Sequence, residues 1–333
     1  MAEEFRTIGV AGAGAWGTAL GQTVARAGRD VLIWAFEPET AEAINSAHEN
    51  SVFLPGIALE KSLRATHRLA DLAVCDALLL VTPAQHTRRI AGKLSRLMPD
   101  ERPVLICAKG IEQSSRKLLS EVLAEALPQA VPAVLSGPSF ADEVARGLPA
   151  ALTLACADED LGSRLSRLVG HRTFRPYWSP DVTGAQIGGA IKNVLAIAAG
   201  IVTGRRLGAN AHAALVTRGF YEMTQVGEAL GARFETMVGL SGLGDLVLTC
   251  GSPRSRNMSL GQALGEGKTL EEVLGARRSV SEGVHTASAV MAIARERGLD
   301  LPICTAVDAV VAGRLSVDAA IENLLARPIR AEM

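Results

Sequence analysis

The sequence has few aromatic residues and no excess of either charge. Phe, Trp and Tyr make up 4% of the 333 residues, so the cores must be built from Ala, Val, Leu and Ile. The 34 Lys and Arg residues nearly balance 35 Asp and Glu residues, for a formal net charge of -1. A nucleic-acid or polybasic membrane surface needs a basic excess, so we expect neither partner. A hydrophobic content of 48% excludes wholesale disorder.

Cysteine is sparse and scattered. The five cysteines form no Cys-x-x-Cys pair, and the six histidines show no metal-ligand spacing, so we predict neither a disulfide framework nor a metal site. Residues 1–6 carry two acids and no apolar stretch, unlike a secretory signal. The longest apolar run contains a lysine and is too short to be predicted as a membrane span. We expect a cytoplasmic protein in a reducing compartment.

The length suggests about two domains at roughly 150 residues per domain. Strand-like apolar runs alternate with helical stretches up to about Pro180, which predicts βαβ units and a parallel, right-handed, doubly wound sheet. The strands are expected at 7–11, 31–34, 75–81, 104–108, 134–135 and 151–155. Apolar residues then recur at helical spacing over 185–202, 213–230, 269–274, 286–297 and 317–325. We therefore predict a Rossmann-type α/β domain over 1–180 and an all-α domain over 181–333.

A glycine-rich turn follows the first predicted strand and opens a predicted helix over 15–27. Its sequence, Gly12-Ala13-Gly14-Ala15-Trp16-Gly17, is a G-x-G-x-x-G in the context that a dinucleotide site requires. Gly12 permits the tight turn, Gly14 lets the backbone approach a pyrophosphate, and Gly17 allows close helix–strand packing. The N-terminus of the helix favours the phosphates. The turn predicts binding of NAD or NADP.

The choice between the two coenzymes stays open. Glu37 lies twenty residues past Gly17, where an acid would accept a hydrogen bond from a ribose hydroxyl. The alternative is that Glu37 belongs to a solvated loop. No arginine lies between Trp34 and Ala43 to pair with the extra phosphate of NADP, which favours NAD. Phe36 is placed to stack on the adenine.

Lys192 stands in a helical stretch that is otherwise almost wholly apolar. Between Ile187 and Val202 only Lys192 and Asn193 are polar. Burial of an ammonium group lowers its pKa and suits it to general acid–base catalysis. The alternative is a lysine whose stem packs on apolar neighbours while its ammonium reaches solvent. Because hydride transfer to a carbonyl also needs a proton donor, Lys192 is the candidate for that donor.

Several segments carry a resemblance to a known family. They are Gly12–Leu20, Lys109–Glu112, Ser136–Ala141, Gly189–Val194, Gly242–Leu246 and Ser255–Asn257. In this order, over essentially the whole chain, they resemble the NAD(P)-dependent glycerol-3-phosphate dehydrogenases of bacteria. The resemblance implies reduction of dihydroxyacetone phosphate to sn-glycerol 3-phosphate by NAD(P)H, for glycerophospholipid biosynthesis.

The resemblance also implies roles for individual residues. Lys192 matches the proton acceptor of glycerol phosphate oxidation, Lys109 a contact to both cofactor and substrate, and Asp245 a substrate-binding acid that Thr249 assists. Ser255, Arg256 and Asn257 match a phosphate grip, where a guanidinium fork suits a dianion and Arg256 also approaches the cofactor. Gly137 and Ser139 match further substrate contacts. The matching cofactor contacts are Ala15, Trp16, Phe36, Ala141, Val280 and Glu282. His285 is assigned no role.

Some alternatives remain. A β-hydroxyacid dehydrogenase of the 6-phosphogluconate type also pairs a glycine-rich turn with a lysine beside an asparagine, but lacks the Gly244-Asp245 and Ser255–Asn257 pairing. A non-catalytic dinucleotide sensor would need no lysine in an apolar helix. Apart from the resemblance, Asp245 fits a turn or helix cap, and Ser255–Asn257 fits a solvated loop. We also expect a homodimer, supported by the Ala-rich helical domain.

Overall fold

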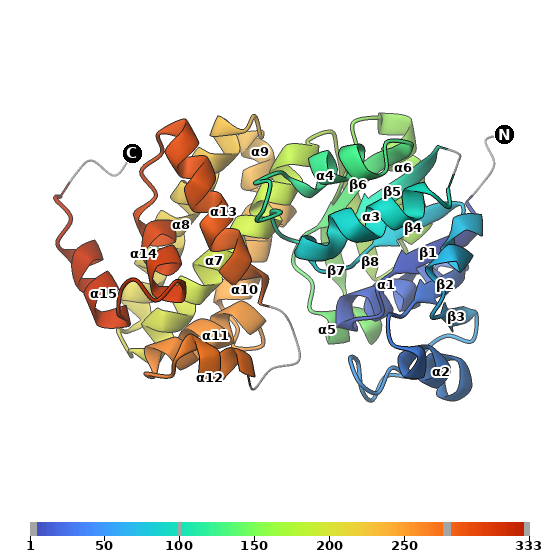
Figure 1. The fold of residues 1–333 in the computed structure, drawn as a ribbon, viewed down its shortest axis with the longest axis horizontal. Helices are drawn as coiled ribbons and strands as arrows, with labels where there is room; N and C mark the ends of the chain where they lie inside the picture. The colour runs from blue at the N-terminus through green and yellow to red at the C-terminus, as the bar shows by residue number, and fades with distance from the viewer. Residues whose placement is uncertain (1–4, 99–100, 276–280, 330–333) are drawn as a thin grey trace.

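The structure is a computed structural model that describes residues 5–98, 101–275 and 281–329. A sheet flanked by helices occupies one half of the molecule and a helical bundle the other (Figure 1). The predicted fold, a doubly wound α/β part followed by a helical part, is confirmed. Val280 lies outside the described residues.

Eight strands form a single sheet in the order β3-β2-β1-β4-β5-β6-β7-β8. The first six are parallel and follow the strand order of dinucleotide-binding folds. Their bounds are Thr7–Ala11, Asp30–Trp34, Leu63–Thr66, Ala77–Leu80, Arg102–Ile106 and Ala130–Ser136, followed by β7 at Ala150–Ala155 and β8 at Phe174–Ser179.

The expectation of a wholly parallel sheet is wrong at one edge. Strand β7 runs antiparallel to β6, and β8 is parallel to β7. The connection from β6 to β7 contains only α5 (Ala141–Ala145), a helix of about 7.5 Å at 1.5 Å per residue. Such a helix is too short to return the chain along a whole strand, so β7 starts from the edge at which β6 ends.

Sequence patterns missed the strands β3 and β8. They are the two outermost strands of the sheet and include Arg64, Arg175 and Pro176. Charged residues and proline are typical of edge strands, where they discourage pairing with other chains, but they also obscure the apolar pattern.

Helices cover both faces of the sheet. The strands alternate between two cores: in β4, Ala77 and Leu79 face the core under α1, α2, α5 and α6, whereas Leu78 and Leu80 face the core under α3 and α4. The helices are α1 (Ala15–Arg26), α2 (Pro38–Ala47), α3 (Thr87–Ser95), α4 (Leu119–Ala126) and α6 (Glu159–Val169), besides α5.

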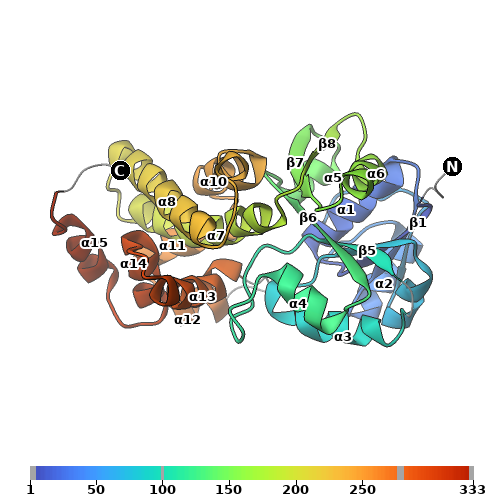
Figure 2. The ribbon, with the colours of Figure 1, turned by 90° about the horizontal axis from the view of Figure 1, so that it is seen from above.

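The second half is a bundle arranged around α7 (Val182–Gly204), as Figure 2 shows from above. Around it lie α8 (Ala209–Ala229), α9 (Phe234–Met237), α10 (Asp245–Cys250), α11 (Arg256–Gly265), α12 (Leu270–Gly275), α13 (Glu282–Arg297), α14 (Pro302–Val311) and α15 (Val317–Leu325). Sequence patterns missed α9, α10, α11 and α14. The first two are too short to show a helical period, and α11 is rich in polar residues and glycine.

Helix α7 is longer than the sequence suggested. With 23 residues it is long and apolar enough to cross a membrane by length and composition alone. However, 89% of its most apolar 18-residue window is buried inside the protein, as in the core helix of a bundle. Glycines bring its neighbours close: a Cβ on Gly200 would lie 2.0 Å from the carbonyl oxygen of Met258 in α11. The apolarity of α7 therefore serves internal packing.

Candidate active site

The glycine-rich turn has the geometry of a phosphate cradle. Gly12 has a φ of 125°, and a Cβ on Gly17 would lie 1.9 Å from the carbonyl oxygen of Gly12. A Cβ on Gly14 would meet no atom of the described chain within 4 Å, so the space over this residue is open. No side chain caps the N-terminus of α1. The exposed backbone N–H groups of the helix are thus available to a pyrophosphate, and the turn fits the cofactor.

Three further loops leave the sheet at the edge where the glycine-rich turn lies. Because β1, β4, β5 and β6 are parallel, the residues that follow them lie on one side: Gly12, Thr82, Lys109 and Gly137. Strand order reverses between β1 and β4, and such a switch point at the carboxyl edge is where open α/β sheets bind ligands. The cofactor turn and Lys109 therefore share one crevice.

The three residues predicted to be catalytic meet in one cluster. The Nζ atom of Lys192 donates to Oδ1 of Asp245 at 2.6 Å and to Oγ1 of Thr249 at 2.9 Å. Oδ2 of Asp245 accepts a hydrogen bond from Nζ of Lys109 at 2.8 Å. Lys192 comes from α7, Asp245 from α10 and Lys109 from the loop after β5, so the cluster bridges the two halves of the chain.

Burial controls the charge of Lys192. The residue is 7% exposed, and removal from water lowers its pKa from the ordinary 10.5 to about 8. The Asp245 carboxylate opposes this lowering and the nearby Lys109 ammonium adds to it, and the pKa of about 8 is the net result. The lysine is therefore protonated near neutral pH but can release its proton readily. The alternative of a lysine reaching into solvent does not apply.

A short π-helix places Asp245. The segment Leu240–Gly244 precedes α10, and a Cβ on Gly242 would lie 1.9 Å from the carbonyl oxygen of Met237. Asp245 directly follows this segment; it is completely buried and pairs with Lys192 of α7. Single π-turns of this kind occur often at functional sites, because the widened turn redirects a side chain. Asp245 is therefore the hub of the lysine cluster rather than a cap on the surface.

The residues of the predicted phosphate grip lie at the N-terminus of α11. The hydroxyl of Ser255 caps α11 by accepting from the N–H of Met258 at 3.3 Å. The amide of Asn257 is buried, donating to Oδ1 of Asn193 at 2.9 Å and accepting from the N–H of Gly283 at 3.1 Å. Arg256 is exposed at the first turn of α11. Two of the three side chains thus organise the helix N-terminus, and Arg256 is the one at the surface.

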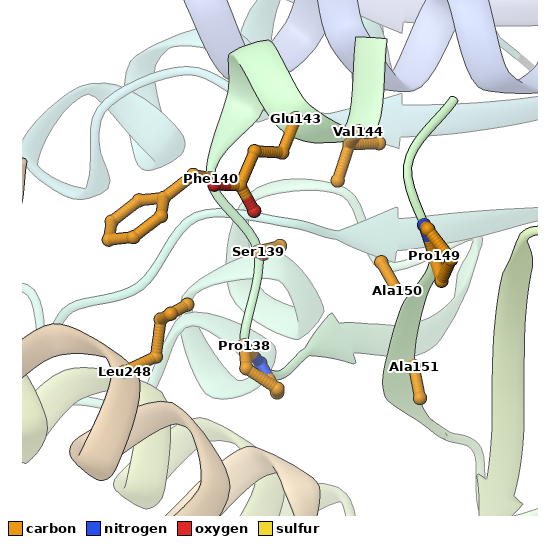
Figure 3. A pocket seen from close by; sticks show the side chains of 9 residues that line it. All are labelled: Pro138, Ser139, Phe140, Glu143, Val144, Pro149, Ala150, Ala151 and Leu248. Atoms are coloured by element: carbon orange, nitrogen blue, oxygen red, sulfur yellow. The ribbon is translucent and has the colours of Figure 1, made fainter. Parts of the chain in front are cut away.

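The turn after β6 contacts the cluster of Lys192, Asp245 and Lys109 through Lys109. The carbonyl oxygen of Gly137 accepts from Nζ of Lys109 at 2.8 Å and from the hydroxyl of Ser139 at 3.0 Å. Gly137 has a φ of 150°, and a Cβ there would lie 2.9 Å from the Cα of Leu152. A pocket of about 210 Å³ adjoins the turn, with Leu248 of α10 opposite Phe140 (Figure 3). Its other lining residues are Pro138, Ser139, Glu143, Val144, Pro149, Ala150 and Ala151.

The remaining predicted cofactor contacts surround the crevice. Ala15 and Trp16 open α1, Ala141 opens α5, and Phe36 is 66% exposed just after β2. Glu282 opens α13 and accepts from the N–H of Ala84 at 3.0 Å, and burial raises its pKa. Val280 lies outside the described residues. Glu37 is exposed at the start of α2, and His285 contacts Gln113, so the structure gives neither a place in the cluster.

Sequence reasoning assigned no role to three residues that support the site. Asn193 donates to the carbonyl oxygen of Lys109 and accepts from Asn257, linking the three segments. The bidentate pair between Arg88 and the buried Glu112 anchors the loop that carries Lys109. The polarity of Asn193 in an apolar helix was a usable signal. Nothing local in the sequence pairs Arg88 with Glu112.

Comparison with known proteins places the chain in a family. The N-terminal region of the NAD-dependent glycerol-3-phosphate dehydrogenases matches residues 7–162, and their C-terminal region matches residues 181–322. A glycerol-3-phosphate dehydrogenase (NAD(P)+) of Parvibaculum lavamentivorans is 62% identical over 332 residues, covering 100% of both chains. One of Caulobacter vibrioides is 58% identical, covering 98% of this chain and 99% of its own.

A solved structure agrees with these matches. The glycerol-3-phosphate dehydrogenase of Coxiella burnetii superposes with a TM-score of 0.93 at 35% identity, covering 97% of this chain and 99% of that one. The agreement extends across both the sheet and the helical bundle. The chain therefore belongs to the NAD-dependent glycerol-3-phosphate dehydrogenase family.

Proposed function

We propose that the protein catalyses the reduction of dihydroxyacetone phosphate to sn-glycerol 3-phosphate with NADH or NADPH. The observation that carries this proposal is the buried Lys192–Asp245–Lys109 cluster beside the carboxyl edge of the sheet. The cluster contains the proposed proton donor, Lys109 joins it to the sheet edge that carries the glycine-rich turn, and membership of the family supplies the substrate. The product is the backbone precursor of glycerophospholipids, which gives the protein a role in lipid biosynthesis.

The cofactor is expected along the carboxyl edge of the sheet. Its pyrophosphate would lie over Gly14 at the N-terminus of α1, with Gly12, Ala15, Trp16 and Gly17 shaping the turn. Phe36 would flank the adenine, and Ala141, Arg256 and Glu282 would approach from the other side of the crevice. When bound, the reduced nicotinamide supplies the hydride.

Lys192 is the proton donor in this proposal. Asp245 and Thr249 take two of its three N–H donors, which leaves the third for the carbonyl oxygen of the substrate. Below a pKa of about 8 the ammonium is charged and protonates the oxygen as the hydride arrives at carbon. In the reverse direction the neutral amine accepts the proton of the alcohol.

Lys109 and Asp245 help to determine the net charge of the site. Two ammonium groups share one carboxylate, so the cluster carries a net positive charge in a largely buried setting. Such preorganised charge stabilises a developing alkoxide and attracts an anionic substrate. Lys109 also donates a hydrogen bond to the carbonyl of Gly137, which keeps the lysine near Ser139, another residue expected to touch the substrate.

The N-terminus of α11 is the proposed phosphate site. Arg256 is exposed on its first turn, while Ser255 and Asn257 hold the turn in place through internal hydrogen bonds. A guanidinium group and the N–H groups of a ten-residue helix suit a phosphate dianion. Ser255 and Asn257 thus support phosphate binding mainly by placing Arg256 and the helix backbone.

We further propose a division into a dinucleotide-binding domain over 1–180 and a helical domain over 181–333. The sheet ends at Ser179 and the long helix α7 begins at Val182, which supports a boundary between them. A homodimer and a cytoplasmic location are proposed on the resemblance and composition. Size-exclusion chromatography with light scattering tests the dimer.

Absorbance at 340 nm, recorded with dihydroxyacetone phosphate and either NADH or NADPH, tests the function. We expect consumption of the reduced coenzyme that depends on the phosphorylated ketone. Faster NAD(P)-linked oxidation of hydroxyacids would instead favour a β-hydroxyacid dehydrogenase. Coenzyme binding without turnover of any carbonyl phosphate would favour a dinucleotide sensor.

A further inference from the structure

Arg254 links two segments that border the proposed substrate site. It directly precedes Ser255, the cap of α11, and so adjoins the proposed phosphate site. Its partners belong to the other half of the molecule: Asp142 and Glu143 stand in α5, just after the turn that contains Gly137 and Ser139.

Arg254 contacts α5 in three ways. One guanidinium nitrogen, Nη2, pairs with Oδ1 of Asp142, and the other, Nη1, pairs with Oε1 of Glu143. The guanidinium plane also lies over the ring of Phe140, 4.6 Å from its centroid. Phe140 and Glu143 line the pocket in Figure 3, so Arg254 lies at the edge of that pocket.

The three contacts act together on one side chain. An isolated exposed ion pair contributes little, because holding two long side chains costs entropy and solvent screens the charges. Here one planar group satisfies two carboxylates and an aromatic face at once, which suits arginine and not lysine. The side chain is 44% exposed, so the link is accessible to salt and can form and break.

We propose that Arg254 is a positioning residue that ties the phosphate site at α11 to the Gly137–Ala141 turn and so holds the substrate site closed. The proposal rests on the proposed function. Lys109 and Asp245 join the same two halves deep in the crevice, whereas Arg254 joins them at the surface beside α5. Without Arg254 the deep ion pair would persist, but the spacing between Arg256 and Ser139 would vary.

The test compares Arg254→Ala, Arg254→Lys and the double variant Asp142→Asn/Glu143→Gln. Arg327→Ala is the control, because Arg327 forms a similarly exposed ion pair with Asp300, and both residues belong to the helical half of the molecule. We expect Arg254→Ala to raise KM for dihydroxyacetone phosphate by about 3- to 10-fold while kcat changes less than about twofold. The double variant should reproduce this effect, and combining it with Arg254→Ala should add little. Arg254→Lys should be intermediate.

Two further readouts separate positioning from general damage. The Kd of NADH, from fluorescence titration, should not change in Arg254→Ala. Amide hydrogen exchange of residues 141–147 and 252–257 should be faster in Arg254→Ala than in the wild type, and unchanged in Arg327→Ala. Exchange needs no turnover, so it tests the link even if the wild type fails to reduce dihydroxyacetone phosphate. Unchanged exchange, or a KM equal to that of Arg327→Ala, would overturn the proposal.

Discussion

The cofactor turn and the lysine cluster handle charge in opposite ways. The turn over Gly12–Gly17 uses backbone N–H groups and the absence of side chains, and its parts are six consecutive residues. The cluster uses three charged side chains that are at least 53 residues apart in the chain; Lys192 and Asp245 are buried, and Lys109 is partly exposed. One site is built by local conformation and the other by tertiary packing.

This difference predicts how each region responds to change. A site built from backbone groups should bind the cofactor equally well over a range of pH, and its affinity for the cofactor should fall when an added methyl group fills its space. A buried charged cluster depends on protonation and loses rate when one group is removed, because its charges are matched to each other.

The largest expected effect is that of Lys192→Ala. Loss of a general acid typically costs about 10²- to 10⁴-fold in turnover, and we expect kcat to fall within that range. Folding should persist, because Asp245 keeps its ion pair with Lys109. Steady-state kinetics with dihydroxyacetone phosphate measure the loss, and NADH titration should give a nearly unchanged Kd. A kcat near that of the wild type would remove Lys192 from this role.

The next effect in size is that of Arg256→Ala. Loss of charged hydrogen bonds worth about 1.5–3 kcal/mol corresponds to a rise in KM of about 10- to 100-fold. The matched control is unphosphorylated dihydroxyacetone, whose kcat/KM should be the same for the wild type and for Arg256→Ala. An unchanged KM for the phosphorylated ketone would argue against the phosphate site at α11.

A pair of alanine substitutions probes the turn itself. In Gly17→Ala the new methyl group meets a backbone carbonyl, so we expect a loss of stability of about 1–3 kcal/mol together with weaker NADH binding. In Gly14→Ala the methyl group enters open space, so NADH binding should weaken about tenfold with a much smaller loss of stability. Thermal unfolding and fluorescence titration separate the two. Equal loss of stability in both variants would contradict this division of roles.

The smallest effect is that of pH. The pKa of Lys192 is lowered to about 8, and the donor form exists below that value. The kcat for ketone reduction should therefore fall as pH rises, to about half its neutral value near pH 8, while the kcat for alcohol oxidation should rise. The Kd of NADH should stay level from pH 7 to 9, since no titrating side chain builds the turn. A level kcat over the same interval would contradict the role of the lysine.

Local patterns predicted the turn and its strand–helix setting well, because the strand, the glycines and the helix follow one another directly in the chain. They also singled out Lys192, since a lone ammonium in an apolar helix needs a partner. The partner came from the resemblance and not from a local pattern: Asp245 was expected to hold Lys192 charged, with Thr249 nearby, and both reach Lys192 after a π-turn that no apolar period shows. Ser255 and Asn257 carry side chains suited to phosphate, but internal hydrogen bonds engage both.

The amino-acid sequence by itself determined the features that depend on local interactions: the alternating apolar runs, the glycines that the turn requires, and a charged residue in an apolar helix. Tertiary structure decided which groups meet. The antiparallel β7 and the pairings of Asp245 with two lysines and of Arg254 with α5 depend on how distant segments pack, and packing energy is shared among residues far apart in the chain.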